Sequence, residues 1–174
     1  VVRTPLMALA QKITFAGKIT NVAAEYFATA ADVYTLTGDL DPAENMAETA
    51  DGAAKTIEAS ACRIARMVGC DAADAPLNSW IELAHVFKNV QLEQIRQAVK
   101  QQMRLLDDHS DLKLIGAGAG AFLAAEIASQ LALEYQPVSA MMHATDQQVL
   151  DKALVCFPAY AVACLGLNDA GVNA

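Results

Sequence analysis

The sequence is poor in positive charge. It contains 12 lysines and arginines against 20 aspartates and glutamates, which gives a net charge of −8, and its basic residues form no run. Proteins that bind nucleic acid or anionic membranes concentrate lysine and arginine on one surface. The composition therefore disfavours nucleic acid and membrane as partners.

Cysteine and histidine are scarce and scattered. The four cysteines are Cys62, Cys70, Cys156 and Cys164. Because none forms a C-x-x-C pair, we expect reduced, mostly buried thiols in a cytoplasmic protein, and neither a zinc ribbon nor a disulfide framework. The three histidines are His85, His109 and His143. They lie far apart along the chain, which argues against a histidine zinc site.

Long hydrophobic runs are absent as well. The most apolar stretch, residues 153–167, is shorter than the roughly 20 residues of a membrane-spanning helix, and it contains Pro158. We expect a buried helix with a kink or break near Phe157–Pro158, because proline disrupts helical hydrogen bonding. The first residues also lack the basic-then-apolar order of a signal peptide.

The remaining composition is typical of a globular domain. Of the 174 residues, 55% are hydrophobic and 18% are charged. This length and this balance predict one domain, residues 1–174, with a substantial core. The pattern of turns and apolar periodicity indicates an α/β fold that is rich in helices.

Apolar periodicity and cap residues place the elements along the chain. The expected helices cover residues 22–36, 57–68, 79–106, 122–134 and 147–167. The expected strands are a pair within residues 11–19 and single strands at 112–115, which should be buried, and at 138–142. Asn21 is a candidate N-cap, Ser79 with Glu82 is a candidate capping box, and Gly38 should end the first helix. On the long helix, Trp80 is expected in the core and not as a stacking platform, and His85 as a boundary residue and not as a ligand.

A glycine turn is the first candidate for chemistry. Gly116, Gly118 and Gly120 lie between an expected strand and an expected helix. Such a turn lets backbone N–H groups approach an anion or a nucleotide at the helix N-terminus. The chain lacks a Walker lysine and the G-x-G-x-x-G spacing with a ribose-binding acid. The alternative, which the sequence leaves open, is that small residues only let helix and strand pack closely.

Two pairs of charged residues are further candidates. Glu25 and Asp32, seven residues apart on one expected helix, are suited to hold a metal through water or to act as acid and base. The alternative is a pair of solvated helix charges, which periodicity alone favours. Arg63 and Arg66 project from one helix face, and with Arg3 they are candidates for binding phosphate. Surface salt bridges are the alternative there.

Several motifs follow one another in an order that resembles one family. They are R-T-P at Arg3–Pro5, E-Y-F-A-T-A-A-D-V-Y-T-L-T-G-D-L at Glu25–Leu40, T-A-D-G at Thr49–Gly52, C-R-I-A-R-M-V-G-C-D at Cys62–Asp71 and G-A-G-A-F-L from Gly118. From Arg3 to about Gly166 the chain is similar to the tetrahydromethanopterin-linked C1-transfer proteins of the hydantoinase/oxoprolinase-like group. The family's glycine loop usually reads G-x-G-E-x-L, and Ala121 replaces its acidic residue here.

The resemblance implies a fold and a reaction. The fold is the second lobe of an actin-like, sugar-kinase-like ATPase, with RNase H-like topology. A preceding lobe with aspartate-glycine phosphate loops is expected, as an N-terminal half or a partner subunit, and the protein is expected to be an oligomer. The implied enzyme is a transferase of methanofuran or methylofuran biosynthesis. It joins an aminomethylfuran methyl diphosphate to the phenol oxygen of a tyramine-glutamate and releases diphosphate.

The resemblance also implies site residues. The expected catalytic residues are Glu25, Asp32, Asp51, Arg63 and Arg66, and the expected cofactor-binding residues are Arg3, Thr4, Gly116, Gly118 and Gly120. Asp51 is expected to hold Mg²⁺, the arginines to stabilise diphosphate, and Glu25 to take the phenolic proton. ATP is a further expected ligand. Two other interpretations remain open: an ATP-dependent hydrolase or kinase of the same fold, and a non-catalytic lobe that acts as a binding module.

Overall fold

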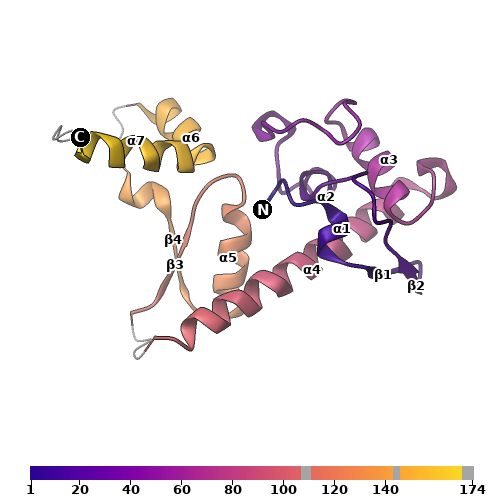
Figure 1. The fold of residues 1–174 in the computed structure, drawn as a ribbon, viewed down its shortest axis with the longest axis horizontal. Coiled ribbons are helices and arrows are strands. Elements are labelled where there is room, and N and C mark those ends of the chain that lie inside the picture. The colour runs from indigo at the N-terminus through magenta and orange to yellow at the C-terminus, as the bar shows by residue number, and fades with distance from the viewer. Residues whose placement is uncertain (107–110, 143–145, 170–174) are drawn as a thin grey trace. The chain divides into compact units, whose positions relative to one another are not determined.

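The computed structural model describes residues 1–106, 111–142 and 146–169 (Figure 1). The chain divides into two compact units, residues 1–106 and 107–174. In the described residues each unit is mostly helical and has a two-stranded sheet. This is the helix-rich α/β class that the sequence predicts, while the single domain over residues 1–174 stays a prediction.

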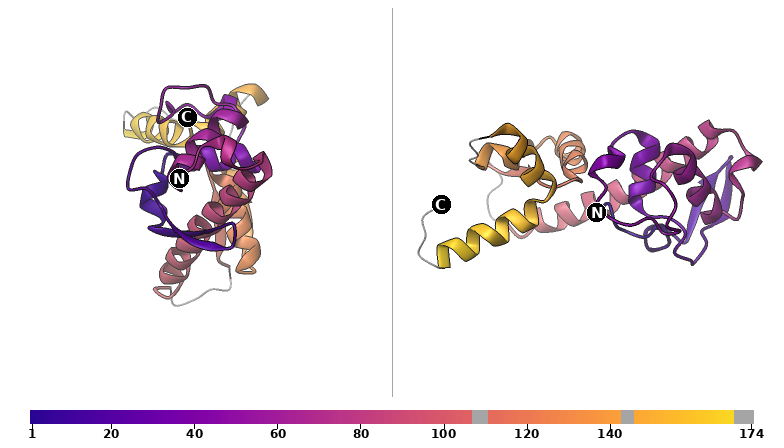
Figure 2. Two further views of the ribbon diagram at one scale, coloured as in Figure 1. Left: turned by 90° about the vertical axis from the view of Figure 1, so that its right-hand side faces the viewer. Right: turned by 90° about the horizontal axis from the view of Figure 1, so that it is seen from above.

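The first unit is built around three helices that pack on one another. Its elements are α1 (Leu6–Leu9), β1 (Lys12–Phe15), β2 (Lys18–Asn21), α2 (Ala30–Thr37), the 3₁₀ turn η1 (Pro42–Glu44), α3 (Ile57–Met67), the 3₁₀ turn η2 (Ala72–Asp74) and α4 (Leu77–Met103). Helix α2 contacts both α3 and α4, and β1 lies against α4. Figure 2 shows this helical group from two further sides. The core of the unit therefore lies where α2, α3 and α4 meet.

Trp80 anchors that core. Its side chain is buried, and its indole N–H donates to the carbonyl oxygens of Ala72 at 2.9 Å and Ala75 at 3.2 Å. Its ring stacks on Phe15 with 5.3 Å between the ring centroids. The predicted core position is confirmed, and the contact joins the hairpin to the first turn of α4.

The β1–β2 hairpin also confirms a prediction. The two strands are antiparallel, with Lys12 opposite Asn21 and Phe15 opposite Lys18. The two turn residues, Ala16 and Gly17, have φ of 46° and 74°. Positive φ at both central residues is typical of a two-residue turn that matches the twist of the strands.

Helix α2 begins later than the sequence predicts. Asn21 closes β2, and the helix starts at Ala30 after Thr29. The backbone N–H groups of Ala30 and Ala31 donate to carbonyl oxygens in the N-terminal segment, those of Thr4 and Val2, at 2.8 Å each. These contacts between distant parts of the chain hold the residues before Ala30 out of the helix. The end is as predicted, because Gly38 caps α2 with φ of 76°.

Helix α4 begins earlier than the sequence predicts. It starts at Leu77, and Pro76 is its N-cap residue. Ser79 therefore lies within the first turn, and the capping box of Ser79 with Glu82 is wrong. Proline disfavours the helical conformation in the residue before it, and Ala75 is extended, so the helix cannot begin before Pro76.

The second unit contains a strand–turn–helix–strand motif. Its elements are β3 (Lys113–Gly116), α5 (Ala121–Gln130), β4 (Glu134–Pro137), the 3₁₀ turn η3 (Val138–Met141), α6 (Gln147–Val155) and α7 (Phe157–Asp169). Strands β3 and β4 are parallel, and α5 packs on both. The strand expected at residues 138–142 is wrong, since β4 ends at Pro137. The first strand is not buried as expected: Ile115 is 47% exposed, because a two-stranded sheet leaves alternate side chains uncovered.

The apolar C-terminal segment is broken where proline predicts it. Helices α6 and α7 meet at Cys156 and are bent by 101°. The segment is less buried than expected, because Val162 and Leu165 of α7 are exposed. Among the described residues no single helix has the length and apolar character of a membrane span. In the same described residues, the bent pair of α6 and α7 reaches that length and apolar character when its two helices are counted together.

Candidate functional site

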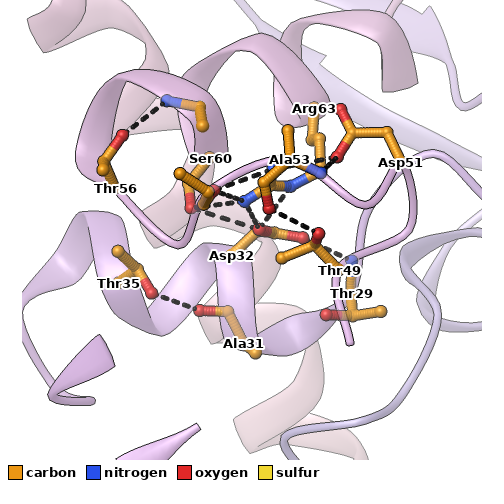
Figure 3. A network of polar contacts seen from close by, with 12 residues as sticks. Thr29, Ala31, Asp32, Thr35, Thr49, Asp51, Ala53, Thr56, Ser60 and Arg63 are labelled. Atoms are coloured by element: carbon orange, nitrogen blue, oxygen red, sulfur yellow. Dashed lines mark hydrogen bonds and ion pairs between the residues drawn. The ribbon is translucent and has the colours of Figure 1, made fainter. Parts of the chain in front are cut away.

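A charged cluster joins α2, α3 and the loop between them (Figure 3). We call Asp32, Asp51, Ser60, Arg63 and Arg66 the arginine cluster. Its centre is Arg63 of α3, whose side chain is 0% exposed and lies between the two aspartates (Figure 3). Burying a guanidinium costs roughly several kcal/mol unless hydrogen-bond acceptors and opposite charges surround it. The partners of Arg63 therefore show whether it is held for stability or is open to a ligand.

Asp32 forms the buried side of the cluster. Its Oδ1 accepts from Arg63 Nε at 2.8 Å and lies 2.7 Å from Arg63 Nη2. Ser60 Oγ donates to the same oxygen at 3.1 Å. The other oxygen, Oδ2, accepts the backbone N–H of Thr29 at 2.9 Å. Asp32 thus neutralises Arg63 and also satisfies an N–H group at the start of α2, which fits a structural role.

The remaining donors of Arg63 also have protein acceptors. Nη1 donates to Asp51 Oδ1 at 3.1 Å and to the Ala54 carbonyl at 3.3 Å. Nη2 donates to the same carbonyl at 3.3 Å and to Ser60 Oγ at 3.2 Å. A guanidinium has five N–H groups in a fixed fork, and these contacts use every nitrogen. In this arrangement Arg63 positions its neighbours.

Asp51 forms the accessible side of the cluster. Its Oδ1 contacts Arg63 and its Oδ2 accepts from Arg66 Nη1 at 3.2 Å, so one carboxylate bridges two guanidiniums. The Asp51 side chain is 27% exposed and that of Arg66 is 45% exposed. Asp51 lies on a turn that Gly52 completes with φ of 70°, as the Asp-Gly pair predicts.

The surroundings of Asp51 favour its ionised form. Partial burial, the largest single influence, raises the pKa of this carboxyl group. The hydrogen bond from the Ala53 backbone, the charge of Arg63 and the side-chain hydrogen bonds from Arg63 and Arg66 together outweigh burial and lower the pKa below 3.8. Asp51 is therefore a carboxylate at neutral pH, held by cations on one side of α3.

The structure brings together four of the five residues that were predicted to be catalytic. Asp32, Asp51, Arg63 and Arg66 lie in the arginine cluster. Glu25 does not share a helix with Asp32, so that prediction is wrong: it is exposed in the non-helical segment before α2. The late start of α2 is the reason.

Two of the predicted binding residues lie in the N-terminal segment beside α2. Thr4 accepts the N–H group of Ala30 through its carbonyl, and Pro5 pairs with Thr29. Arg3 is exposed. Sequence reasoning missed Ser60, which contributes two contacts to the buried side of the cluster. Its position three residues before Arg63, on the same helix face, is the signal that would have identified it.

A magnesium ion bound by Asp51 does not fit this arrangement. Both oxygens of Asp51 face guanidiniums, whose charge repels a second cation, and Asp32 is taken up by Arg63. Within the described ranges no three His, Cys, Asp or Glu side chains gather in a metal-binding group. Of the histidines, His85 is exposed on α4, and His109 and His143 lie outside the described residues. A magnesium site at Asp51 stays a prediction, and it requires the Asp51 carboxylate to leave both arginines.

The cysteines are less buried than the sequence led us to expect. All four are free, and Cys156 is exposed while Cys62, Cys70 and Cys164 are half-buried. Cys70 follows the end of α3, and Cys156 lies between α6 and α7, so these two thiols are not on a buried helix face.

The glycine turn of the second unit has a local explanation. Gly116 is the last residue of β3, and a Cβ atom there would lie 2.4 Å from the Tyr135 hydroxyl. Gly118 has φ of 72°, which favours glycine, and Gly120 is the N-cap residue of α5. Close packing and backbone conformation account for Gly116 and Gly118. A ligand at this turn stays a prediction.

Comparison with known proteins agrees with the motifs. The family model described as Hydantoinase/oxoprolinase matches residues 3–146. Two curated relatives carry the name (4-{4-[2-(gamma-L-glutamylamino)ethyl]phenoxymethyl}furan-2-yl)methanamine synthase. The protein of Methanocaldococcus jannaschii is 36% identical over 97 residues, which are 56% of this chain and 29% of that protein. The protein of Methanococcus vannielii is 31% identical over 99 residues, which are 55% of this chain and 45% of that protein.

The chain therefore matches less than half the length of either curated relative. The family model, by contrast, covers most of the chain. Its match begins at Arg3, where the R-T-P motif stands, and includes the whole arginine cluster and the glycine turn. The chain belongs to the hydantoinase/oxoprolinase family, whose fold is of the actin-like ATPase type.

Proposed function

We propose that this chain is the second lobe of an actin-like enzyme that forms the aryl ether of a methanofuran-type coenzyme. The name of both relatives describes such a product, a furan joined through a methylene group to a phenol oxygen. In the proposed reaction the phenol oxygen of a tyramine-glutamate attacks the methylene carbon of an aminomethylfuran methyl diphosphate. The carbon–oxygen bond to diphosphate breaks, diphosphate leaves with the bonding electrons, and a base takes the phenolic proton.

One observation supports this assignment most directly: two guanidiniums converge on a single oxyanion at the surface of α3. Arg63 and Arg66 each contact a different oxygen of Asp51. Guanidiniums bind phosphate oxygens in the same paired manner, and stabilising the charge of a leaving group is a major source of rate enhancement. Arg66 is the accessible contact for the diphosphate. Arg63 is buried, and it would contribute the Nη1 group that now contacts Asp51.

Glu25 is the proposed base. It lies in the exposed segment that leads to α2, where a substrate phenol has access to it. A carboxylate that accepts a proton as the ether bond forms contributes typically 10²–10⁴-fold to rate. The Glu25→Gln protein should therefore lose kcat with little change in KM for the furan diphosphate.

The decisive assay uses the full-length protein, in which the preceding lobe accompanies this chain. It supplies the furan diphosphate and tyramine-glutamate and measures the ether by mass spectrometry beside released diphosphate. Arg66→Ala should lower kcat/KM by roughly 10²-fold, the usual effect of removing one charge-stabilising donor. Arg96→Ala is the matched control, because Arg96 is an arginine of the same unit that pairs with Glu93 on α4. No ether from the unaltered protein, or full activity of Arg66→Ala, contradicts the proposal.

The family description favours a second candidate, an ATP-dependent hydrolase or kinase of the same fold. The glycine turn before α5 is then the proposed nucleotide contact. ADP release separates the two candidates, because the ether-forming reaction liberates diphosphate and needs no ATP turnover. The third candidate is a non-catalytic binding module. Binding of these compounds without conversion of any of them would support it.

A further inference from the structure

We propose that Asp51 is a displaceable internal ligand, which occupies the anion site of Arg63 and Arg66 until a diphosphate group takes its place. This inference rests on the proposed function, since it assumes that the two arginines bind the diphosphate of the substrate. It adds a regulatory step to that site: the resting site is closed by the protein's own carboxylate, and the substrate's phosphate oxygens open it.

The two aspartates of the cluster are held very differently. Asp32 lies 2.7–2.8 Å from Arg63, has a 5% exposed side chain, and is also bound by Ser60 and Thr29. Asp51 lies 3.1 Å from Arg63 and 3.2 Å from Arg66, with a 27% exposed side chain. Its other hydrogen bond is local, from the N–H group of Ala53 two residues along the chain at 3.1 Å. Asp51 can leave at much lower cost than Asp32.

The departure of Asp51 does not strand a buried charge. Arg63 keeps the carboxylate of Asp32, and its Nη1 keeps the Ala54 carbonyl at 3.3 Å. Arg66 is nearly half exposed and is solvated when unpaired. A diphosphate carries more negative charge than a carboxylate and offers several oxygens to the same two guanidiniums. In this exchange a diphosphate with more negative charge replaces the Asp51 carboxylate. Arg63 and Arg66 already contact two separate oxygens, so they need not rearrange.

Apart from the contacts of Asp51 with the two arginines, the loop that carries Asp51 is held at its ends. Asp39 at its start accepts from Lys88 of α4 at 2.9 Å, and Thr56 at its end caps α3. Between them the tip is closed mainly on itself: Thr49 Oγ1 donates to the Ala53 carbonyl at 2.7 Å. Movement of residues 49–53 alone thus suffices to withdraw the carboxylate, while α2 and α3 stay in place.

Binding of inorganic pyrophosphate, measured by isothermal titration calorimetry, tests the inference. Asp51→Asn should bind pyrophosphate about tenfold more tightly than the unaltered protein, because a competing charge is removed from the arginines. Asp41→Asn is a close control. Asp41 lies in the same loop and also accepts the N–H group two residues on, that of Ala43 at 2.8 Å, so the change removes an equal charge elsewhere. Its affinity should be unchanged.

A second measurement follows the carboxylate itself. The ¹³Cγ signal of Asp51 in nuclear magnetic resonance should move toward that of a solvated carboxylate when pyrophosphate is added to the unaltered protein, because the carboxylate then loses both guanidiniums. An unmoved signal at saturating pyrophosphate shows that Asp51 stays in place and overturns the inference.

The outcomes separate the inference from the proposed function. If the unaltered protein and Arg66→Ala bind pyrophosphate equally, or neither binds, the anion site fails and both proposals fall. If Arg66→Ala weakens binding but Asp51→Asn binds no tighter than the unaltered protein, only the inference falls. Weaker binding by Asp51→Asn would favour a direct role for Asp51 in holding the ligand or a metal bound to it.

Discussion

The T-A-D-G turn at residues 49–52 was expected to hold Mg²⁺ through Asp51, and the glycine turn at residues 116–120 to contact an anion or a nucleotide, but the two turns are built from different interactions. The first brings an aspartate side chain to two arginines of α3. The second is shaped by backbone conformation and by the Tyr135 ring that lies over Gly116. Charge is concentrated at the first turn, and shape alone is evident at the second.

The comparison teaches that a sequence motif and a network of ion pairs in the structure are different kinds of evidence for a binding site. Asp51 and Arg66 are polar groups that stay partly accessible while opposite charges hold them, which is typical of a binding surface. Gly116 and Gly118 have sufficient reasons to be glycine within the fold itself. We therefore propose the arginine cluster as the site of the chemistry, and substitutions in each region can weaken or sharpen this distinction.

The largest expected effect comes from breaking the buried side of the cluster. Asp32→Ala leaves Arg63 without its closest carboxylate and removes the acceptor of Ser60 and Thr29. Breaking a buried ion pair by removing one partner costs about 3–5 kcal/mol of unfolding free energy. Trp80 is the single tryptophan of the chain and is buried in this unit, so its fluorescence during urea unfolding reports the loss. Asp41→Ala is the control, and an equal effect of the two changes would contradict the prediction.

Much of the local structure around these sites was predictable because short-range chemistry determines it. The hairpin at Ala16-Gly17, the cap at Gly38 and the break near Pro158 each depend on residues within a few positions. Arg63 and Arg66 were placed on one face of α3 by their spacing, and both contact Asp51. Features of this kind can be predicted because one or two neighbouring residues determine them.

The rest depended on contacts between distant segments. The apolar spacing from Val22 favoured a helix. In the structure the carbonyl groups of Val2 and Thr4 accept the N–H groups at the start of α2. Spacing within the segment does not reveal these distant contacts. The burial of Arg63 was equally hidden, since it depends on Asp32 thirty-one residues earlier. The T-x-x-D pattern from Thr29 to Asp32 was the available signal for the true helix start.

Ser60→Ala weakens the same buried network by a smaller amount. Ser60 is 1% exposed, donates to Asp32 and accepts from Arg63 Nη2. The change removes two hydrogen bonds to charged groups in a buried site, while Asp32 and Arg63 keep each other as partners, and it should cost about 1–3 kcal/mol. The same urea experiment measures it, with the half-buried Ser79 of α4 changed to alanine for comparison. If the two serine variants are equally stable, the network contributes less than its geometry indicates.

Gly116→Ala examines the other region. The added Cβ meets the end of the Tyr135 side chain, which can turn away, so we expect a loss of about 1–2 kcal/mol, toward the low end for overpacking. In a Tyr135→Ala background the loss should shrink. Gly118→Ala is the matched control, because its cost comes from φ of 72° and should be the same in both backgrounds. Calorimetric unfolding measures the stability loss for each glycine change in both backgrounds. A loss at Gly116 that does not shrink in the Tyr135→Ala background would contradict the packing explanation.

The smallest expected effect is the pH dependence of the accessible side of the cluster. The pKa of Asp51 is lowered below 3.8 in the folded protein, so its ionised form stabilises the fold above that value, and this contribution is lost as the pH falls through the folded-state pKa. The difference in unfolding free energy between the unaltered protein and Asp51→Asn should be constant near neutral pH and shrink below 3.8. Solvent screening keeps it small, because the side chain is 27% exposed. Urea unfolding followed by Trp80 fluorescence across this range measures it. A difference that grows as the pH falls would mean that Asp51 prefers its protonated form, and the two arginines would then not be its main partners.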